Sequence, residues 1–238
     1  MFRRLTVFPT RVEVENHVAT ELLGVIDGAI LTRGRADIVL TGGTVGIGCL
    51  VALERLVRNR SVAWDAVHVW WGDERFVPSG HEDRNDGQAE RALLAHVSIP
   101  AENIHSFPTS RGQTVDEACT EFCAQFPDGF PDFDVVLNGI GPDGHVASLF
   151  PGSTYEIGSE VVAIHNSPKP PSERLSFTFE ALNRASRVWI IAAGIDKSDA
   201  ISRLMAETPA DVTPATALHG TVETAVFVDA DAASQISD

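Results

Sequence analysis

One short segment of the chain concentrates residue types that could transfer protons. It spans residues 139–151 and reads Gly-Ile-Gly-Pro-Asp-Gly-His-Val-Ala-Ser-Leu-Phe-Pro. Three glycines, Pro142, Asp143 and His145 within seven residues are not typical of an ordinary turn. Histidine titrates near neutral pH, so His145 is suited to general-base chemistry. The other seven histidines are scattered and lack the paired spacing of metal ligands, so the sequence predicts no metal site.

A second segment has the composition of an anion cradle. Residues 41–46 read Thr-Gly-Gly-Thr-Val-Gly, directly after an apolar run. Gly42 and Gly43 let backbone N–H groups approach a ligand closely. We expect Thr44 to cap the helix that follows, whose positive N-terminal end favours an anion.

A third segment, residues 71–78, adds a cation beside two carboxylates. It reads Trp-Gly-Asp-Glu-Arg-Phe-Val-Pro. Arg75 offers a planar guanidinium that suits phosphate oxygens. We expect Asp73 to accept hydrogen bonds from sugar hydroxyls and Glu74 to hold Arg75 in place.

The fourth segment, residues 167–174, reads Ser-Pro-Lys-Pro-Pro-Ser-Glu-Arg. Its prolines stiffen the backbone and so restrict the direction of Lys169, and Arg174 adds another cation. All four segments follow a predicted strand, and ligands of α/β proteins bind at the carboxyl ends of the strands. This rule places three cations, a glycine-rich cradle and one histidine at the same edge of a sheet. The arrangement predicts a phosphate site beside a general base.

The elements that position these segments follow from the hydrophobic pattern. Apolar runs predict strands at residues 5–8, 37–40, 66–71, 103–107, 135–138, 161–165, 187–192 and 224–228. The stretches between them predict helices at residues 12–31, 45–57, 85–96, 115–126, 179–183 and 197–205. Several strands are apolar throughout, which is typical of a parallel sheet buried on both faces. We therefore expect a three-layer α/β/α fold with a mostly parallel sheet, formed as one domain by residues 1–238.

The charge balance excludes several classes of partner. The chain has 33 acidic and 18 basic residues and a net charge of −15, which repels nucleic acid and anionic membranes. Its three cysteines, Cys49, Cys119 and Cys123, indicate a reducing compartment without a disulfide framework. No apolar run approaches ~20 residues and no signal-peptide pattern is present. We therefore expect a soluble cytoplasmic protein.

Two common functions, dinucleotide binding and serine-esterase catalysis, can be excluded from their motifs. Gly139, Gly141 and Gly144 match the dinucleotide pattern G-x-G-x-x-G. However, Pro142 and Asp143 lie where a pyrophosphate would approach, and a carboxylate there would repel it. The G-x-S-x-G elbow of serine esterases does not occur. An ester hydrolase built from this chain would therefore use an activated water.

The four segments resemble conserved blocks of the 6-phosphogluconolactonase family, in the same order. Residues 141–151 are nearly identical to the signature of that family, and Gly-Asp-Glu-Arg-x-Val-Pro and Ser-Pro-Lys-Pro-Pro-x-x-Arg match two more blocks. Residues 193–197 and the turn at residues 214–215 are also similar. The chain departs from the family at residues 45–46, which lack its Thr-Pro, and at Asp86, which replaces a tyrosine.

The resemblance implies hydrolysis of a phosphorylated sugar lactone in the oxidative pentose phosphate pathway, without a cofactor. It also implies a modified Rossmann fold related to glucosamine-6-phosphate deaminases and ribose-5-phosphate isomerases. The anionic groups of the substrate would be held by backbone N–H groups near residues 42–44 and by three cations: Arg75, Lys169 and Arg174. His145 would take a proton from the attacking water. Asp143 would orient either the histidine or a sugar hydroxyl.

Two alternative functions stay open at this point. An amino-sugar phosphate deaminase has a similar Asp-Gly-His, followed by Asn-Glu-Pro. Here residues 148–151 read Ser-Leu-Phe-Pro and supply no carboxylate to aid ring opening. A sugar-phosphate-binding regulator would keep the cations without needing His145, and would usually carry a DNA-binding domain for which this chain has no room. As partners we expect only the small-molecule lactone and, at most, a second copy in a weak homodimer.

Overall fold

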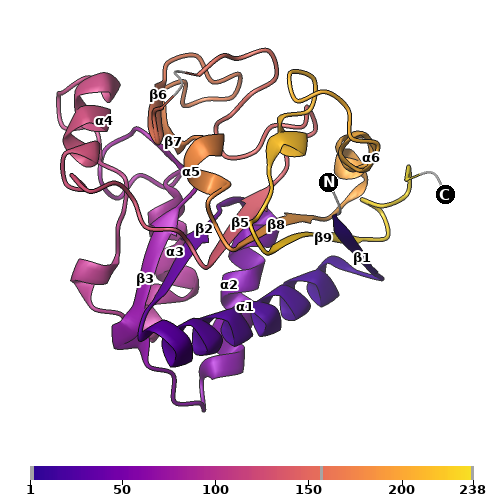
Figure 1. The fold of residues 1–238 in the computed structure, drawn as a ribbon, viewed down its shortest axis with the longest axis horizontal. Helices are drawn as coiled ribbons and strands as arrows, with labels where there is room; N and C mark the ends of the chain where they lie inside the picture. Colours follow the sequence, from indigo (N-terminus) through magenta and orange to yellow (C-terminus); the bar gives the residue numbers. More distant parts are fainter. Residues whose placement is uncertain (1–2, 156–157, 237–238) are drawn as a thin grey trace.

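A six-stranded sheet forms the centre of the fold (Figure 1). The structure is a computed structural model that describes residues 3–155 and 158–236. The strand order is β1-β9-β8-β5-β2-β3, and every neighbouring pair is parallel. The strands are β1 (Arg4–Phe8), β2 (Ala36–Leu40), β3 (Val67–Trp71), β5 (Val135–Gly139), β8 (Arg187–Ala192) and β9 (Glu223–Asp229). The predicted α/β class with a mostly parallel sheet is confirmed.

Helices connect the strands, and the longest has clear start and stop signals. α1 (Arg11–Arg33) begins after Thr10, whose side chain accepts the N–H of Glu13, and ends at Gly34, which has a φ of 73°. In Figure 1, α1 lies on one side of the large sheet and α5 on the other. The other helices are α2 (Gly43–Val57), α3 (Asn85–Ala92), α4 (Val115–Cys123), α5 (Phe179–Leu182) and α6 (Ser198–Met205). Short 3₁₀ turns are η1 (Trp64–Ala66), η2 (Leu94–His96), η3 (Ala101–Asn103), η4 (Ile195–Lys197) and η5 (Pro214–Ala217).

A second sheet was not predicted. It has the order β4-β7-β6, is antiparallel, and consists of β4 (Asp73–Arg75), β7 (Arg174–Phe177) and β6 (Val161–Ile164). The strand expected at residues 161–165 therefore exists as β6 but does not belong to the parallel sheet. β4 is three charged residues, so it has no apolar pattern and becomes a strand only by pairing with β7.

The strand predicted at residues 103–107 is wrong. The chain there forms η3 and a single parallel bridge to β3. The apolar pattern reflects aromatic packing instead, because the Phe107 ring lies 4.7 Å from Phe122 of α4 and 5.4 Å from Phe177 of β7. These rings attach α4 and the small sheet to the body of the protein.

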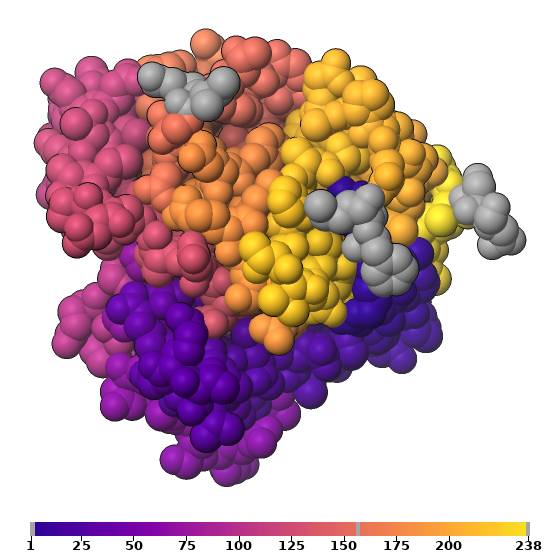
Figure 2. Space-filling view, in the orientation of Figure 1, coloured from indigo at the N-terminus to yellow at the C-terminus, as the bar shows by residue number. Residues whose placement is uncertain are grey.

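The first and last strands of the described chain lie side by side. β1 pairs with β9, so the indigo N-terminal and yellow C-terminal parts adjoin in the space-filling view (Figure 2). Because all six strands of the large sheet are parallel, the loops after them emerge at one edge. No helix in the described part of the chain is long and apolar enough to span a membrane.

Candidate active site

A cavity at the carboxyl edge of the large sheet brings the predicted segments together. It measures about 160 Å³ and adjoins a second cavity of about 450 Å³, with which it shares several lining residues. Most of the predicted site residues line the smaller cavity: Gly42, Gly43, Asp73, Arg75, His145, Lys169 and Arg174. Thr44 lines the larger cavity, and Asp143 contacts His145. Segments separated by more than one hundred residues therefore meet at one place.

His145 and Asp143 form a hydrogen-bonded pair at this cavity. His145 Nδ1 lies 2.5 Å from Asp143 Oδ1, which also accepts the backbone N–H of His145 at 3.2 Å. When Nδ1 carries the proton that Asp143 accepts, Nε2 is the basic nitrogen. In the structure, Asp143 thus orients the histidine.

The local backbone fits closely around this pair, and burial shifts the pKa of the histidine. A Cβ at Gly141 would lie only 2.1 Å from His145 Nδ1 and 2.6 Å from Asp143 Oδ1, so this position needs glycine. Burial lowers the pKa of His145 below its ordinary value, although the charge of Asp143 opposes this shift. His145 is therefore neutral near pH 7, which is the form that a general base requires.

Glu74 holds Arg75 through the backbone N–H of that residue and not through its guanidinium. The Glu74 carboxylate is buried and accepts the backbone N–H groups of Arg75, Asn85 and Asp86 at 2.8, 2.8 and 2.9 Å. Burial raises the pKa of Glu74 to about 7, against the lowering effect of Arg84. Glu74 therefore anchors the start of α3 and the backbone of Arg75.

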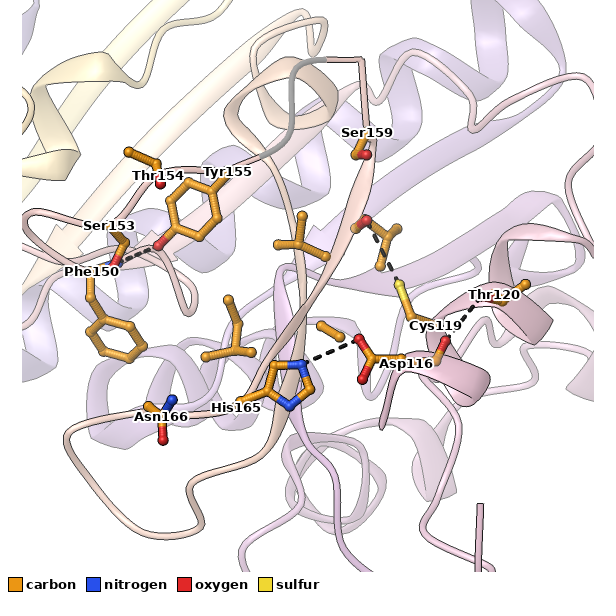
Figure 3. A pocket seen from close by; sticks show the side chains of 14 residues that line it. Asp116, Cys119, Thr120, Phe150, Ser153, Thr154, Tyr155, Ser159, His165 and Asn166 are labelled. Atoms are coloured by element: carbon orange, nitrogen blue, oxygen red, sulfur yellow. Dashed lines mark hydrogen bonds and ion pairs between the residues drawn. The ribbon is translucent and has the colours of Figure 1, made fainter. Parts of the chain in front are cut away.

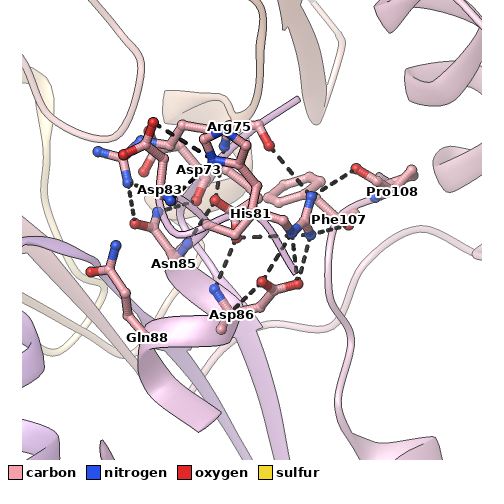
Figure 4. A network of polar contacts seen from close by, with 12 residues as sticks. Asp73, Arg75, His81, Asp83, Asn85, Asp86, Gln88, Phe107 and Pro108 are labelled. Atoms are coloured by element: carbon pink, nitrogen blue, oxygen red, sulfur yellow. Dashed lines mark hydrogen bonds and ion pairs between the residues drawn. The ribbon is translucent and has the colours of Figure 1, made fainter. Parts of the chain in front are cut away.

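Asn85 binds the Arg75 guanidinium (Figure 4). The sequence analysis assigned Asn85 no role. Arg75 Nη1 donates to Asn85 Oδ1 and to Asp83 O, each at 2.7 Å. The Asn85 amide donates in turn to Asp73 O at 2.8 Å. Asn85 lines the cavity itself, so it joins the third segment to the cavity wall.

The fourth segment reaches the cavity through the small sheet. Arg174, the first residue of β7, donates to Lys169 O at 2.9 Å and to Pro171 O at 3.2 Å. Its Nη1 lies 3.8 Å from Asp73 Oδ2, which also accepts the Ser148 hydroxyl at 2.6 Å. Arg174 therefore holds the loop that carries Lys169. Arg174 also lines the cavity itself.

The prediction that Thr44 caps α2 is wrong. α2 begins at Gly43, so its cap is Gly42 and Thr44 lies in the first turn. A Cβ at Gly42 would lie 1.9 Å from Asn85 Oδ1, and Gly43 has a φ of 80°. Because glycine has no side chain to occupy the helix terminus, the first-turn N–H groups are available to a ligand.

Lys197 lines both cavities and was not among the predicted site residues. It ends η4, just before α6, and its ammonium pairs with Asp196 at 3.0 Å. The chain contains only two lysines, and the other one, Lys169, lines the same small cavity. In a chain of net charge −15, two lysines that both follow predicted strands were a signal that sequence reasoning did not use.

A larger groove lies between α4 and β6 (Figure 3). It measures about 560 Å³ and contains a second histidine–carboxylate pair, with His165 Nε2 3.2 Å from Asp116 Oδ1. None of the described residues that line this groove is a lysine or an arginine. An anionic ligand would meet no lining cation there, so the groove is not the candidate active site.

The fold and the cavity define a class of α/β protein with cations and one histidine around a cavity at the carboxyl edge of a parallel sheet. Residues 9–227 match the model of the family described as glucosamine-6-phosphate isomerases/6-phosphogluconolactonase. The chain belongs to this family, as the sequence resemblance indicated.

Individual relatives support the same assignment. The 6-phosphogluconolactonase of Mycobacterium leprae is 39% identical over 90% of this chain and 91% of its own. The crystal structure of 6-phosphogluconolactonase from Thermotoga maritima has a TM-score of 0.85 at 24% identity, covering 96% of this chain and 100% of that one. A monomeric glucosamine-6-phosphate deaminase has a TM-score of 0.84 at 19% identity, covering 98% and 99%. These two structures show a shared fold, and the fold alone does not separate the two activities.

Proposed function

We propose that this protein hydrolyses 6-phosphogluconolactone to 6-phosphogluconate, as a cytoplasmic enzyme of the oxidative pentose phosphate pathway. The observation that carries the proposal is the His145–Asp143 pair in the cavity that both lysines line. Relatives that are named for this activity support the reaction. Three free cysteines support a reducing compartment.

The phosphate of the substrate binds where positive charge collects. Lys169 and Lys197 line the smaller cavity together with Gly42 and Gly43 at the start of α2. Ammonium groups and the N–H groups of a helix N-terminus both bind phosphate well. Binding at this remote group holds the lactone ring in place beside the histidine.

His145 then activates the water that attacks the lactone. Its Nε2 takes a proton while the water oxygen bonds to the carbonyl carbon, and backbone N–H groups of the glycine-rich loops stabilise the oxyanion. When the bond between that carbon and the ring oxygen breaks, the imidazolium returns the proton to the ring oxygen. Asp143 stabilises the imidazolium and keeps its orientation.

An amino-sugar phosphate deaminase is the alternative, and it requires a further carboxylate to aid ring opening. Among the described residues that line the smaller cavity, Asp73 is the only carboxylate, and Ser148 and Arg174 already engage it. Residues 146–151 also contain no acidic residue. Both observations favour lactone hydrolysis.

The test follows acid release from freshly generated 6-phosphogluconolactone in the presence of a chelator. We expect a rate well above that of spontaneous hydrolysis. Ammonia release from glucosamine 6-phosphate is measured in parallel, and none is expected. A rate equal to the spontaneous one, or release of ammonia, would overturn the proposal.

The substitution Asp143→Asn is expected to move the acid limb of kcat/KM to lower pH. Asp143 raises the pKa of His145, so a neutral residue there lets that pKa fall further. Activity needs neutral His145 and is lost as pH falls through its pKa, so a lower pKa extends activity to lower pH. The plateau should fall as well, because asparagine does not hold the same tautomer. A profile of kcat/KM between about pH 5 and 8 checks this; an acid limb at unchanged or higher pH contradicts it.

A further inference from the structure

The loop that carries the catalytic pair presents three consecutive carbonyl oxygens to a distant part of the chain. They belong to Pro142, Asp143 and Gly144. Within the loop, Gly144 N donates to Gly141 O and Gly141 N donates to His145 O, each at 2.9 Å. These two bonds close the turn, but they do not fix its position relative to the rest of the protein.

Arg203 of α6 binds two of the three carbonyl oxygens. Its Nη2 donates to Pro142 O at 2.9 Å, and its Nη1 lies 3.4 Å from Asp143 O. The same Nη1 donates to Thr213 Oγ1 at 3.0 Å and to Val212 O at 3.3 Å. One guanidinium therefore joins α6, the catalytic loop and the segment that precedes η5.

The third carbonyl oxygen is held by η5, which follows that segment directly. Ala215 N donates to Gly144 O at 3.0 Å. Gly144 has a φ of 91°, and a Cβ there would lie 2.9 Å from Thr213 Cγ2. The loop and the segment thus pack without room for a side chain, so the position of one sets the position of the other. The Arg203 side chain donates to the catalytic loop and to the segment before η5.

α6 also connects this contact with the phosphate end of the cavity. Arg203 Nε donates to Asp199 Oδ2 at 2.9 Å, which fixes the guanidinium against its own helix. The helix starts at Ser198, directly after Lys197. The cavity lysine therefore caps the start of α6, and the contact with the catalytic loop lies near the other end of that helix.

We propose that Arg203 is a positioning residue for the lactonase reaction, an inference that rests on the proposed function. Arg203 is not among the described residues that line either cavity, so it acts through the loop and not on the substrate. It sets where His145 lies relative to a lactone held by its phosphate. Because a shift of about 1 Å in a catalytic group can lower the rate by a large factor, the effect falls on turnover.

The test compares Arg203→Ala and Arg203→Lys with Arg184→Ala as a matched control. Arg184 also ties separate segments, through Phe130 O and the carboxylates of Asp132 and Glu160. We expect Arg203→Ala to lower kcat about tenfold, with KM within about twofold of wild type. Arg203→Lys should recover part of kcat, because one ammonium keeps the charge but lacks the planar fork. Arg184→Ala should keep the wild-type kcat even if its Tm falls.

Circular dichroism and thermal unfolding report the folded fraction, so kcat is expressed per folded protein. The proposal is overturned if Arg203→Ala keeps the wild-type kcat, if KM alone rises, or if Arg184→Ala loses kcat equally. If Arg203→Ala does not fold, Arg203→Lys decides, and a wild-type kcat in that variant overturns the proposal. If the wild-type protein does not hydrolyse the lactone, the proposed function and this inference are both overturned. If the wild-type protein is active and the Arg203 variants keep its kcat, only this inference is overturned.

Discussion

The substitution His145→Ala is expected to lower kcat for 6-phosphogluconolactone by roughly 10²- to 10⁴-fold, the range that a general base contributes. The reason is that no water can be activated once the Nε2 base is removed. KM should stay within about twofold of the wild-type value, because the proposed phosphate contacts of the lysines and the start of α2 do not involve His145. The measurement is acid release from fresh lactone, with the spontaneous rate subtracted at each substrate concentration.

The groove between α4 and β6 supplies a matched control for this variant. His165 also pairs with an aspartate, Asp116, but in a place where no lining cation is described. We expect His165→Ala to keep the wild-type kcat and KM. If His145→Ala retained kcat within a few-fold of wild type, another group would have to activate the water and the assigned role of His145 would be wrong.

The substitution Lys197→Ala should lower kcat/KM for the phosphorylated lactone by roughly 10- to 100-fold. A hydrogen bond to a charged group contributes about 1.5–3 kcal/mol, and each factor of ten corresponds to about 1.4 kcal/mol. Most of the loss should be a higher KM, because the phosphate does not change during the reaction. Steady-state kinetics with this variant and with Lys197→Arg, which keeps the charge, measure the effect.

Gluconolactone without a phosphate is the control substrate for Lys197. Wild type and Lys197→Ala should hydrolyse it at the same rate, because the lysine then has no anion to bind. An equal loss on both lactones would mean that Lys197 supports the fold or the chemical step, and it would contradict phosphate binding. Amine acylation gives a second readout, since Lys169 and Lys197 are the only lysines of the chain and inorganic phosphate should protect both.

The parallel sheet and most of the cavity residues could be predicted from local patterns. β5 and β8 are short, mostly apolar runs that are buried over nearly their whole length, as such runs predict. The loop around His145 is unusual in composition and follows β5 directly. For such features, a window of a few residues contains the physical cause, so the sequence is sufficient.

The route of Lys169 to the cavity could not be predicted in this way. The rule that ligands bind at the carboxyl ends of parallel strands places Lys169 at the cavity, because its segment follows a predicted strand. That strand is β6, which belongs to the antiparallel sheet, so the rule does not apply to it. The loop is held instead by Arg174 of β7, which pairs with the three charged residues of β4. The predicted location agrees with the structure, while the reason differs.

The amino-acid sequence by itself determined the parallel α/β class and the chemical groups around the cavity: an anion cradle, cations and one histidine with an adjacent carboxylate. Only the tertiary structure decided which group holds which. It assigned Asn85 to Arg75, Glu74 to the start of α3, and Lys197 to the cavity. The physical reason is that periodicity and turn composition depend on neighbouring residues, whereas these contacts join different elements that meet only in the folded chain.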